Sequence, residues 1–262
     1  MAGRLRFAFQ PAEESAGGAK PMIAAGVLDG IDRVIGLHVW AALPTGQVSV
    51  REGAMMASAD WFTLTVRGKG GHGAIPEATV DAVVIAAQIV TALQTLASRE
   101  TSPRAPVVVT LGSIHGGSAF NIIAGEVVIQ GTLRTFDSGL REQLLRRIAE
   151  LAQGMAQAMR GSCEFRHKSG APAVVNDAAI AALVSSAARG VLGEPALVPF
   201  EPLMVGEDFS YFLEQRPGCF FLLGGAPEGP PIAHHTAEFQ IDERCLPIGL
   251  RVMTAAVLRL LT

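Results

Sequence analysis

Acidic and imidazole side chains follow three apolar runs of this 262-residue chain. Glu13 and Glu14 stand side by side after RLRFAF, His38 lies in GLHVW, and His234 and His235 follow FFLLGG. In open α/β sheets the carboxyl ends of neighbouring strands share one crevice, so side chains at those ends can meet. Carboxylate and imidazole are the oxygen and nitrogen donors that zinc accepts. The pattern therefore indicates a metal site, although each residue alone is more often a solvated loop acid or a hydrogen-bonded histidine.

The two adjacent carboxylates suggest a division of labour. Neighbouring acids cannot easily bind one ion with the same geometry, so one of Glu13 and Glu14 would act as a ligand. The other would take a proton from the attacking water. Their position in the sequence alone does not say which residue has which role.

Hydrophobic periodicity predicts the elements that position these residues. Period-2 runs predict strands at residues 5–9, 33–40, 61–67, 107–114, 126–136, 163–167 and 219–223. Period-3.6 runs predict helices at residues 18–25, 80–98, 139–159, 177–192 and 243–261. The middle stretch has the order βαββαβ of a ferredoxin-like domain, whereas the flanking strands and helices alternate and favour a largely parallel sheet. We therefore expect an α/β protein in which a domain of residues 57–169 is inserted into a domain of residues 1–56 and 170–262.

Composition limits the kinds of partner. The net charge is −3 and no cluster of Lys and Arg occurs, which argues against nucleic acid or an anionic membrane and favours a small-molecule substrate. The apolar stretches 82–97 and 246–261 are interrupted by Gln or Arg, so neither is expected to cross a membrane. Cys163, Cys219 and Cys245 are widely spaced, which suits buried thiols in a reducing cytoplasm. Without a signal-peptide pattern at the start, a cytoplasmic location is predicted.

Six blocks of sequence carry a resemblance that covers essentially the whole chain. They are QPAEE, GLHVW, RGKGGHGAIP, FNIIAGEVVIQGTLRTF, GEDFSYF and HHTAEFQIDE. Together they resemble the zinc-dependent amidohydrolase family of hippurate hydrolase, aminoacylases and plant hormone amino-acid-conjugate hydrolases. The resemblance implies a catalytic α/β domain with an inserted ferredoxin-like lid that forms a homodimer. It also implies hydrolysis of N-acyl amino acids with two divalent metal ions, zinc or manganese.

The resemblance also assigns roles in the catalytic domain. Glu13 resembles the general base and Glu14 a metal ligand. His38 resembles a ligand of the second ion, and His235 the last ligand, on the same ion as Glu14. His234 aligns one position too early and is the alternative to His235 for that position.

In the lid, the resemblance implies that His72 polarises the scissile carbonyl in the active site of the partner subunit, where negative charge develops during amide hydrolysis. Asn121 resembles a hydrogen-bonding residue on the carbonyl or carboxylate side of the substrate. Arg134 resembles the residue that holds the free carboxylate, which its planar fork can pair bidentately. Without the resemblance, Arg134 would be an ordinary arginine on a strand surface.

Outside the lid, Asp208 either orients a ligand or stands at a helix N-terminus.

The chain departs from the family at its N-terminal end. Family members carry, ahead of QPAEE, a segment with a Cys-Gly-His-Asp motif that supplies further ligands, so this chain is expected to be an N-terminally truncated catalytic domain. Of the ligand set, Glu14, His38 and His235 remain, and strand 5–9 is expected to present unpaired backbone groups. We therefore expect impaired hydrolysis. The alternative is a catalytically inactive, lid-dimerising protein that binds amino-acid derivatives.

Overall fold

The computed structural model describes residues 3–229 and 232–261, which fold as two compact units. The first unit comprises Met1–Met56, Val174–Leu203 and Glu207–Thr262. The second comprises Ala57–Ala173 and Met204–Gly206, so most of it is one continuous stretch interposed in the sequence of the first. The roles expected of the two units, catalytic domain and lid, stay predictions.

The first unit is built around strand β11 (Gly218–Ala226). This strand pairs in parallel with β1 (Val34–Pro44) and antiparallel with β2 (Val48–Ser49), giving a mixed three-stranded sheet. A second pair, β3 (Gly53–Met56) and β10 (Val174–Asn176), is antiparallel. The α/β class with mixed sheets is thus observed, and one of the two strand pairs in the larger sheet is parallel.

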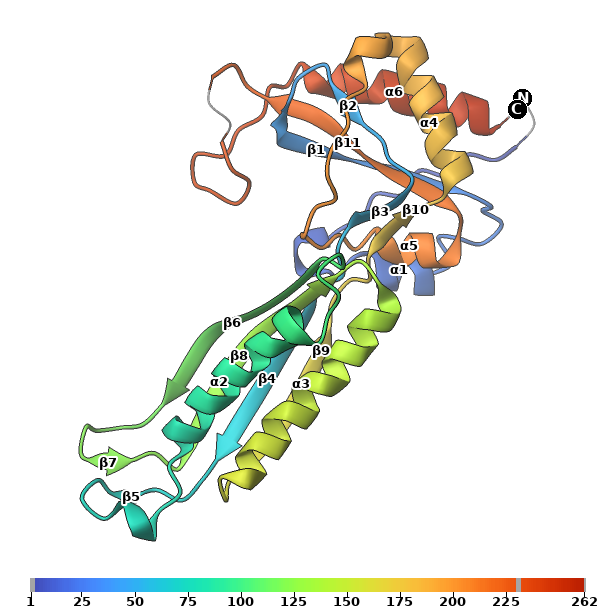
Figure 1. Ribbon diagram of the computed structural model, residues 1–262. Helices are drawn as coiled ribbons and strands as arrows, with labels where there is room; N and C mark the ends of the chain where they lie inside the picture. The colour runs from blue at the N-terminus through green and yellow to red at the C-terminus, as the bar shows by residue number, and fades with distance from the viewer. Residues whose placement is uncertain (1–2, 230–231, 262) are drawn as a thin grey trace. The chain divides into compact units, whose positions relative to one another are not determined.

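Both faces of β11 are covered, which explains its uninterrupted apolar sequence. Cys219, Phe221 and Leu223 pack with helices α4 (Ala178–Leu192) and α6 (Cys245–Leu260), which lie together on one side of the sheet (Figure 1). Phe220 and Leu222 pack into a separate cluster on the other face. Two short helices, α1 (Ala19–Ala24) and α5 (Ser210–Gln215), contact each other on that side (Figure 1).

The strand predicted at residues 5–9 is wrong. These residues belong to no strand, and Leu5, Phe7 and Phe9 are 47%, 74% and 87% exposed. A strand needs a hydrogen-bonded neighbour, and within residues 3–229 and 232–261 strand β1 pairs only with β11. The segment is held instead through Arg6, which donates to the carbonyls of Gly26 and Val27 at 2.9 and 2.7 Å.

The second unit has the predicted βαββαβ order. Its elements are β4 (Asp60–Arg67), α2 (Ala82–Arg99), β6 (Val107–Gly116), β8 (Glu126–Thr135), α3 (Ser138–Ala158) and β9 (Ser162–Ser169). The strands form an antiparallel sheet in the order β6-β8-β4-β9, as in ferredoxin-like folds. A two-stranded piece of β5 (Gly71–His72) and β7 (Ile122–Ile123) stands at one end of the unit (Figure 1). In the part of the chain that the structure describes, 3₁₀ turns occur at Glu13–Ser15, Pro76–Ala78 and Glu194–Ala196.

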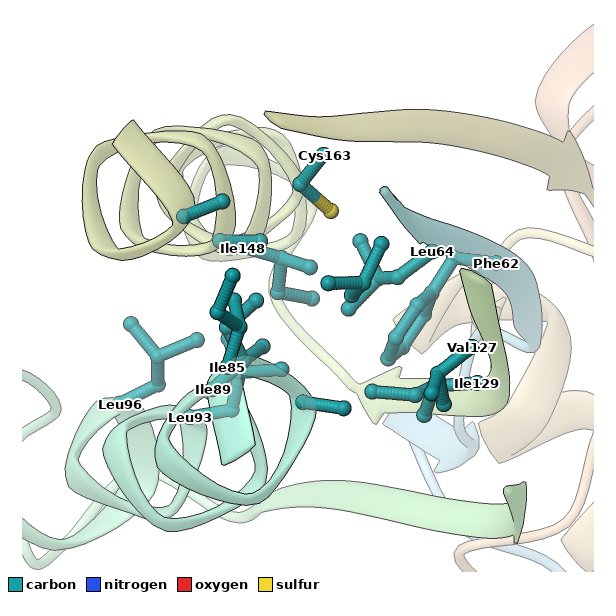
Figure 2. Packing of buried hydrophobic residues seen from close by; sticks show 14 of the residues in the cluster. Phe62, Leu64, Ile85, Ile89, Leu93, Leu96, Val127, Ile129, Ile148 and Cys163 are labelled. Atoms are coloured by element: carbon teal, nitrogen blue, oxygen red, sulfur yellow. The ribbon is translucent and has the colours of Figure 1, made fainter. Parts of the chain in front are cut away.

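Helices α2 and α3 cover one face of this sheet. Figure 2 shows Leu64 and Ile129 from the strands facing Ile89 and Leu93 of α2 and Ile148 of α3, and all five are at most 1% exposed. By length and composition alone α2 could cross a membrane, but its apolar face packs into this core. The length of α2 is therefore accounted for by the fold.

All three cysteines are unpaired and buried, as expected. Burial raises the pKa of the Cys219 thiol to about 12 and that of Cys163 to about 11. They are therefore small core side chains and not reactive thiolates.

Candidate active site

The two adjacent acids lie on a strained turn. Glu13 and Glu14 begin the 3₁₀ turn Glu13–Ser15, and the alanines on either side, Ala12 (φ 55°) and Ala16 (φ 51°), are left-handed. That conformation costs a non-glycine residue about 1–2 kcal/mol and persists where surrounding contacts enforce it. The turn separates the environments of the acids, because Glu13 is half-buried and Glu14 is exposed.

Two further acids surround Glu13. Carboxylate oxygens of Glu13, Glu207 and Asp208 all lie within 4.8 Å of one another, with Glu207 5% and Asp208 0% exposed. Burial raises the pKa of Glu13, and the charges of Asp208 and Glu14 raise it further, while the Asp208 N–H and His235 lower it. Burial, followed by the charges of Glu13, Asp208 and Glu14, raises the pKa of Glu207 to about 8 against the N–H of Phe209. At neutral pH Glu207 therefore carries a proton.

Sequence reasoning missed Glu207. In the block GEDFSYF only Asp208 stood out as a helix N-terminal acid, and nothing in the linear sequence brings Glu207 to Glu13. A detectable signal was an acid directly beside the apolar run of a buried helix, since such a carboxyl loses its water on folding.

Glu14 and His235, which are predicted to share one ion, lie close together. Their Oε2 and Nε2 atoms are 3.7 Å apart, although the residues are far apart in sequence. Both side chains are largely exposed, and His235 itself has a left-handed backbone with φ 62°. A carboxylate and an imidazole placed in this way can contribute to the binding of one divalent ion.

His38 has one ring nitrogen engaged and one available. Its Nδ1 lies 2.7 Å from the carbonyl oxygen of Val39, which fixes the proton on Nδ1. Nε2 is then the nitrogen with the lone pair, the state in which metal-binding histidines are held by their outer hydrogen bonds. The His38 ring also lies 5.5 Å from that of His234, centroid to centroid, so it belongs to the same part of the first unit.

His234 is held as a structural residue. Its Nε2 accepts a hydrogen bond from the N–H of Ala41 at 3.0 Å, and its ring packs against Trp40 and Phe239 at centroid distances of 4.5 and 5.0 Å. Burial lowers the pKa of His234, and His38 and His235 lower it further. The lone pair on Nε2 of His234, which could otherwise bind a metal ion, is thus occupied by this hydrogen bond.

His72 and Asn121 come together in the second unit, where β5 pairs with β7. The N–H of Gly73 donates to the backbone oxygen of Asn121 at 2.8 Å, and both side chains are exposed. His72 Nδ1 accepts from the N–H of Ala74 at 3.1 Å, which leaves the proton on Nε2. The exposed imidazole can therefore donate a hydrogen bond to a carbonyl oxygen.

Arg134 lies at the other end of the second unit. It is half-buried in β8, donates from Nη1 to the Met204 carbonyl at 3.2 Å, and has no carboxylate partner within residues 3–229 and 232–261. Burial lowers the pKa of its guanidinium. From Glu126, next to the His72 end, to Arg134 the extended strand runs ~26 Å. A ligand of amino-acid size cannot touch both His72 and Arg134 of one unit.

The comparisons with known proteins agree with one another. Residues 1–259 match the sequence model of Peptidase family M20/M25/M40. The N-acetyl-L-cysteine deacetylase of Bacillus subtilis (strain 168) is 40% identical over 246 residues, which are 94% of this chain and 58% of that protein. IAA-amino acid hydrolase ILR1-like 4 of Arabidopsis thaliana is 36% identical over 267 residues, which are 100% of this chain and 61% of that protein.

A solved structure extends the likeness to three dimensions. The crystal structure of the Bacillus subtilis YXEP protein, a dinuclear metal binding peptidase from the M20 family, superposes with a TM-score of 0.81 at 30% identity. The superposition covers 97% of this chain and 64% of that one. The chain thus spans about three fifths of the length of these relatives. The match of residues 1–259 shows that the chain belongs to Peptidase family M20/M25/M40.

Proposed function

We propose that this chain is the larger part of a metal-dependent amidohydrolase that cleaves the amide bond of N-acyl amino acids such as hippurate. The observation that carries the proposal is the approach of His235 to Glu14 beside the half-buried Glu13. Two relatives support the substrate class, since their names describe hydrolysis of an N-acetyl amino acid and of amino-acid conjugates.

The metal would be held by Glu14 and His235 at one position and by His38 at a second. These donors fit zinc or manganese, and the fixed Nδ1 proton of His38 leaves Nε2 as the donor. The M20 neighbour from Bacillus subtilis is dinuclear, which supports two ions. When bound, such ions supply positive charge that polarises the carbonyl and acidifies water.

Glu13 acts as the general base in this proposal. The raised pKa of Glu13 brings it closer to neutral pH. A carboxylate with such a pKa can accept a proton from water and later return it to the leaving amine. Glu14, in contrast, is exposed to solvent and is not half-buried as Glu13 is. The difference in burial supports Glu13 as the base and Glu14 as the ligand.

Residues of the second unit bind and orient the substrate. Arg134 holds the free carboxylate of the amino acid, and the Nε2–H of His72 donates to the carbonyl oxygen, with Asn121 beside it. The ~26 Å between these positions supports a homodimer in which His72 serves the active site of the partner subunit. The second unit is then both lid and dimer contact.

A second candidate is binding of amino-acid derivatives without hydrolysis. It is favoured by the small number of metal ligands. In the described part of the chain, the proposed position at Glu14 and His235 has one carboxylate and one imidazole, whereas a catalytic zinc takes about three protein ligands. For both candidate functions we propose a cytoplasmic location, where unpaired thiols such as that of Cys219 persist.

The test is hydrolysis of hippurate and N-acetyl amino acids with zinc or manganese and after chelation. We expect background rates from the 262-residue chain and chelator-sensitive hydrolysis from the same chain extended in frame at its N-terminus to the length of its relatives. Glu13→Gln in the extended protein is the matched inactive control. Carboxylate substrates that bind but are not cleaved by the extended protein would favour the second candidate.

A further inference from the structure

We propose that Asp208 is a positioning residue that holds Glu13 and Glu14 in place by closing the loop of residues 11–17 on which they lie. The inference rests on the proposed function, because it assigns Asp208 a part in the chemistry of those two acids. Asp208 is fully buried and comes from the segment that leads into α5.

One carboxylate binds both ends of the loop. Oδ1 of Asp208 accepts a hydrogen bond from the side-chain amide of Gln10, immediately before the loop. Oδ2 accepts from the backbone N–H groups of Gly18 and Ala19, immediately after it, at 3.0 and 3.1 Å. Hydrogen bonds to a buried, charged acceptor are among the stronger ones in proteins, so this closure is a firm constraint.

Within the described residues, the backbone hydrogen bonds of the loop are internal, while the side chains of Glu13 and Glu14 also reach the Asp208 N–H and His235. Ser15 and Gly17 donate from their N–H groups to the carbonyl of Ala12 at 3.3 and 3.2 Å, and Ala16 donates to the carbonyl of Glu13 at 2.7 Å. These bonds shape the turn but do not attach it to the rest of the unit. Asp208 does, and two left-handed alanines in the loop require such outside support.

The two ends of the loop, at residues 10–11 and 18, pack closely against each other. A Cβ atom on Gly18 would stand 2.0 Å from the carbonyl oxygen of Pro11 and 2.7 Å from Nε2 of Gln10. The two ends of the loop therefore touch where Asp208 binds them. The side chain of Asp208 also lies within 4.8 Å of the Glu13 carboxylate, so the anchor and the proposed base are neighbours.

Three variants separate a hydrogen-bonded anchor from other roles. Asp208→Ala removes all three bonds. Asp208→Asn removes the charge but can keep the bonds: the Asn side-chain oxygen takes the place of Oδ2 and accepts from Gly18 and Ala19, while the Asn NH₂ donates to the side-chain oxygen of a flipped Gln10. Asp177→Ala is the matched control, since Asp177 likewise accepts a backbone N–H, that of Ile180, but at the start of α4.

The first readout is hydrogen exchange of the backbone amides in the 262-residue chain, which needs no activity. In Asp208→Ala the amides of Gly18 and Ala19 should exchange at least ~10-fold faster than in Asp177→Ala at matched stability. The second readout is kinetics of the N-terminally extended, metal-loaded protein. There Asp208→Ala should lower kcat by at least ~10-fold with KM within ~3-fold, and Asp208→Asn should recover most of kcat.

Each outcome bears on one proposal. If the extended wild-type protein does not hydrolyse N-acyl amino acids, the proposed function fails, while amide exchange still decides whether Asp208 holds the loop. Exchange of Gly18 and Ala19 that is equal in Asp208→Ala and Asp177→Ala would overturn the anchor. A kcat equally low in Asp208→Asn and Asp208→Ala would overturn it too, because charge and not hydrogen bonding would then be the cause.

Discussion

The buried carboxyl of Glu207 predicts a pH dependence of stability. Burial, followed by the charges of Glu13, Asp208 and Glu14, raises its pKa from 4.5 to about 8 in the folded protein. Between those values the folded state binds a proton that the unfolded state has released, so the free energy of unfolding falls as pH rises. The contribution is fully present below the unfolded pKa of 4.5 and is lost as pH passes through about 8. The full contribution of Glu207 to the free energy of unfolding is about 5 kcal/mol, because a shift of one pKa unit corresponds to about 1.4 kcal/mol.

Glu207→Gln removes this dependence. The amide keeps the shape of the protonated carboxyl and an oxygen for the Phe209 N–H, which Glu207 binds at 3.0 Å. It cannot ionise, so the variant should resemble the wild-type protein near pH 5 and exceed it by up to about 5 kcal/mol near pH 9. Urea unfolding in the presence of a chelator, at several pH values in that interval, measures the difference. Glu52→Gln, at an exposed position, is the control.

The result that refutes the reasoning is a difference between Glu207→Gln and wild type that does not change with pH. Glu207 would then ionise like an exposed carboxyl, and the burial argument would be wrong. A change confined to the region below pH 4.5 would refute it equally, because the sign requires the change to lie above the unfolded pKa.

Three further outcomes are expected. In the N-terminally extended protein Glu13→Gln should abolish turnover with metal content nearly unchanged, whereas Glu14→Gln should lower metal content; equal metal loss, measured by elemental analysis, would contradict the roles. Gly18→Ala should reduce both turnover and thermal stability, because the new methyl meets the Pro11 carbonyl at 2.0 Å; a variant with unchanged melting temperature would contradict this. Leu93→Ala, in the core of the second unit, should cost about 2–5 kcal/mol in urea unfolding, and the exposed Val83→Ala should cost much less.

Long elements with clear periodicity were predictable from the sequence. Helix α2 and strand β4 follow directly from it, because one face of each is buried against the same core. The two-residue strands β5 and β7 were not predictable, since so short a run carries no period and its pairing depends on two distant loops. The alternation in residues 5–9 is real, but a strand also needs a neighbour, which local sequence cannot supply.

The candidate site was predictable to a similar degree. Adjacent acids and histidines after apolar runs indicated a metal site, and the resemblance then selected Glu14 and His235, whose Oε2 and Nε2 atoms lie 3.7 Å apart in the fold. The approach of Glu207 to Glu13 and the anchoring bonds of Asp208 join parts of the chain about 190 residues apart, so these contacts are visible only in the folded chain.

The exposed row of Leu5, Phe7 and Phe9 has a consequence for handling the protein in solution. A short segment with large exposed apolar side chains and no sheet partner in the described chain is a template on which other copies can pair. Arg4 and Arg6 alternate with the apolar residues and oppose such pairing through repulsion between like charges on neighbouring copies. Salt screens that repulsion over about 10 Å at 0.1 M and strengthens apolar association. Colloidal stability of this chain is therefore greatest at low ionic strength.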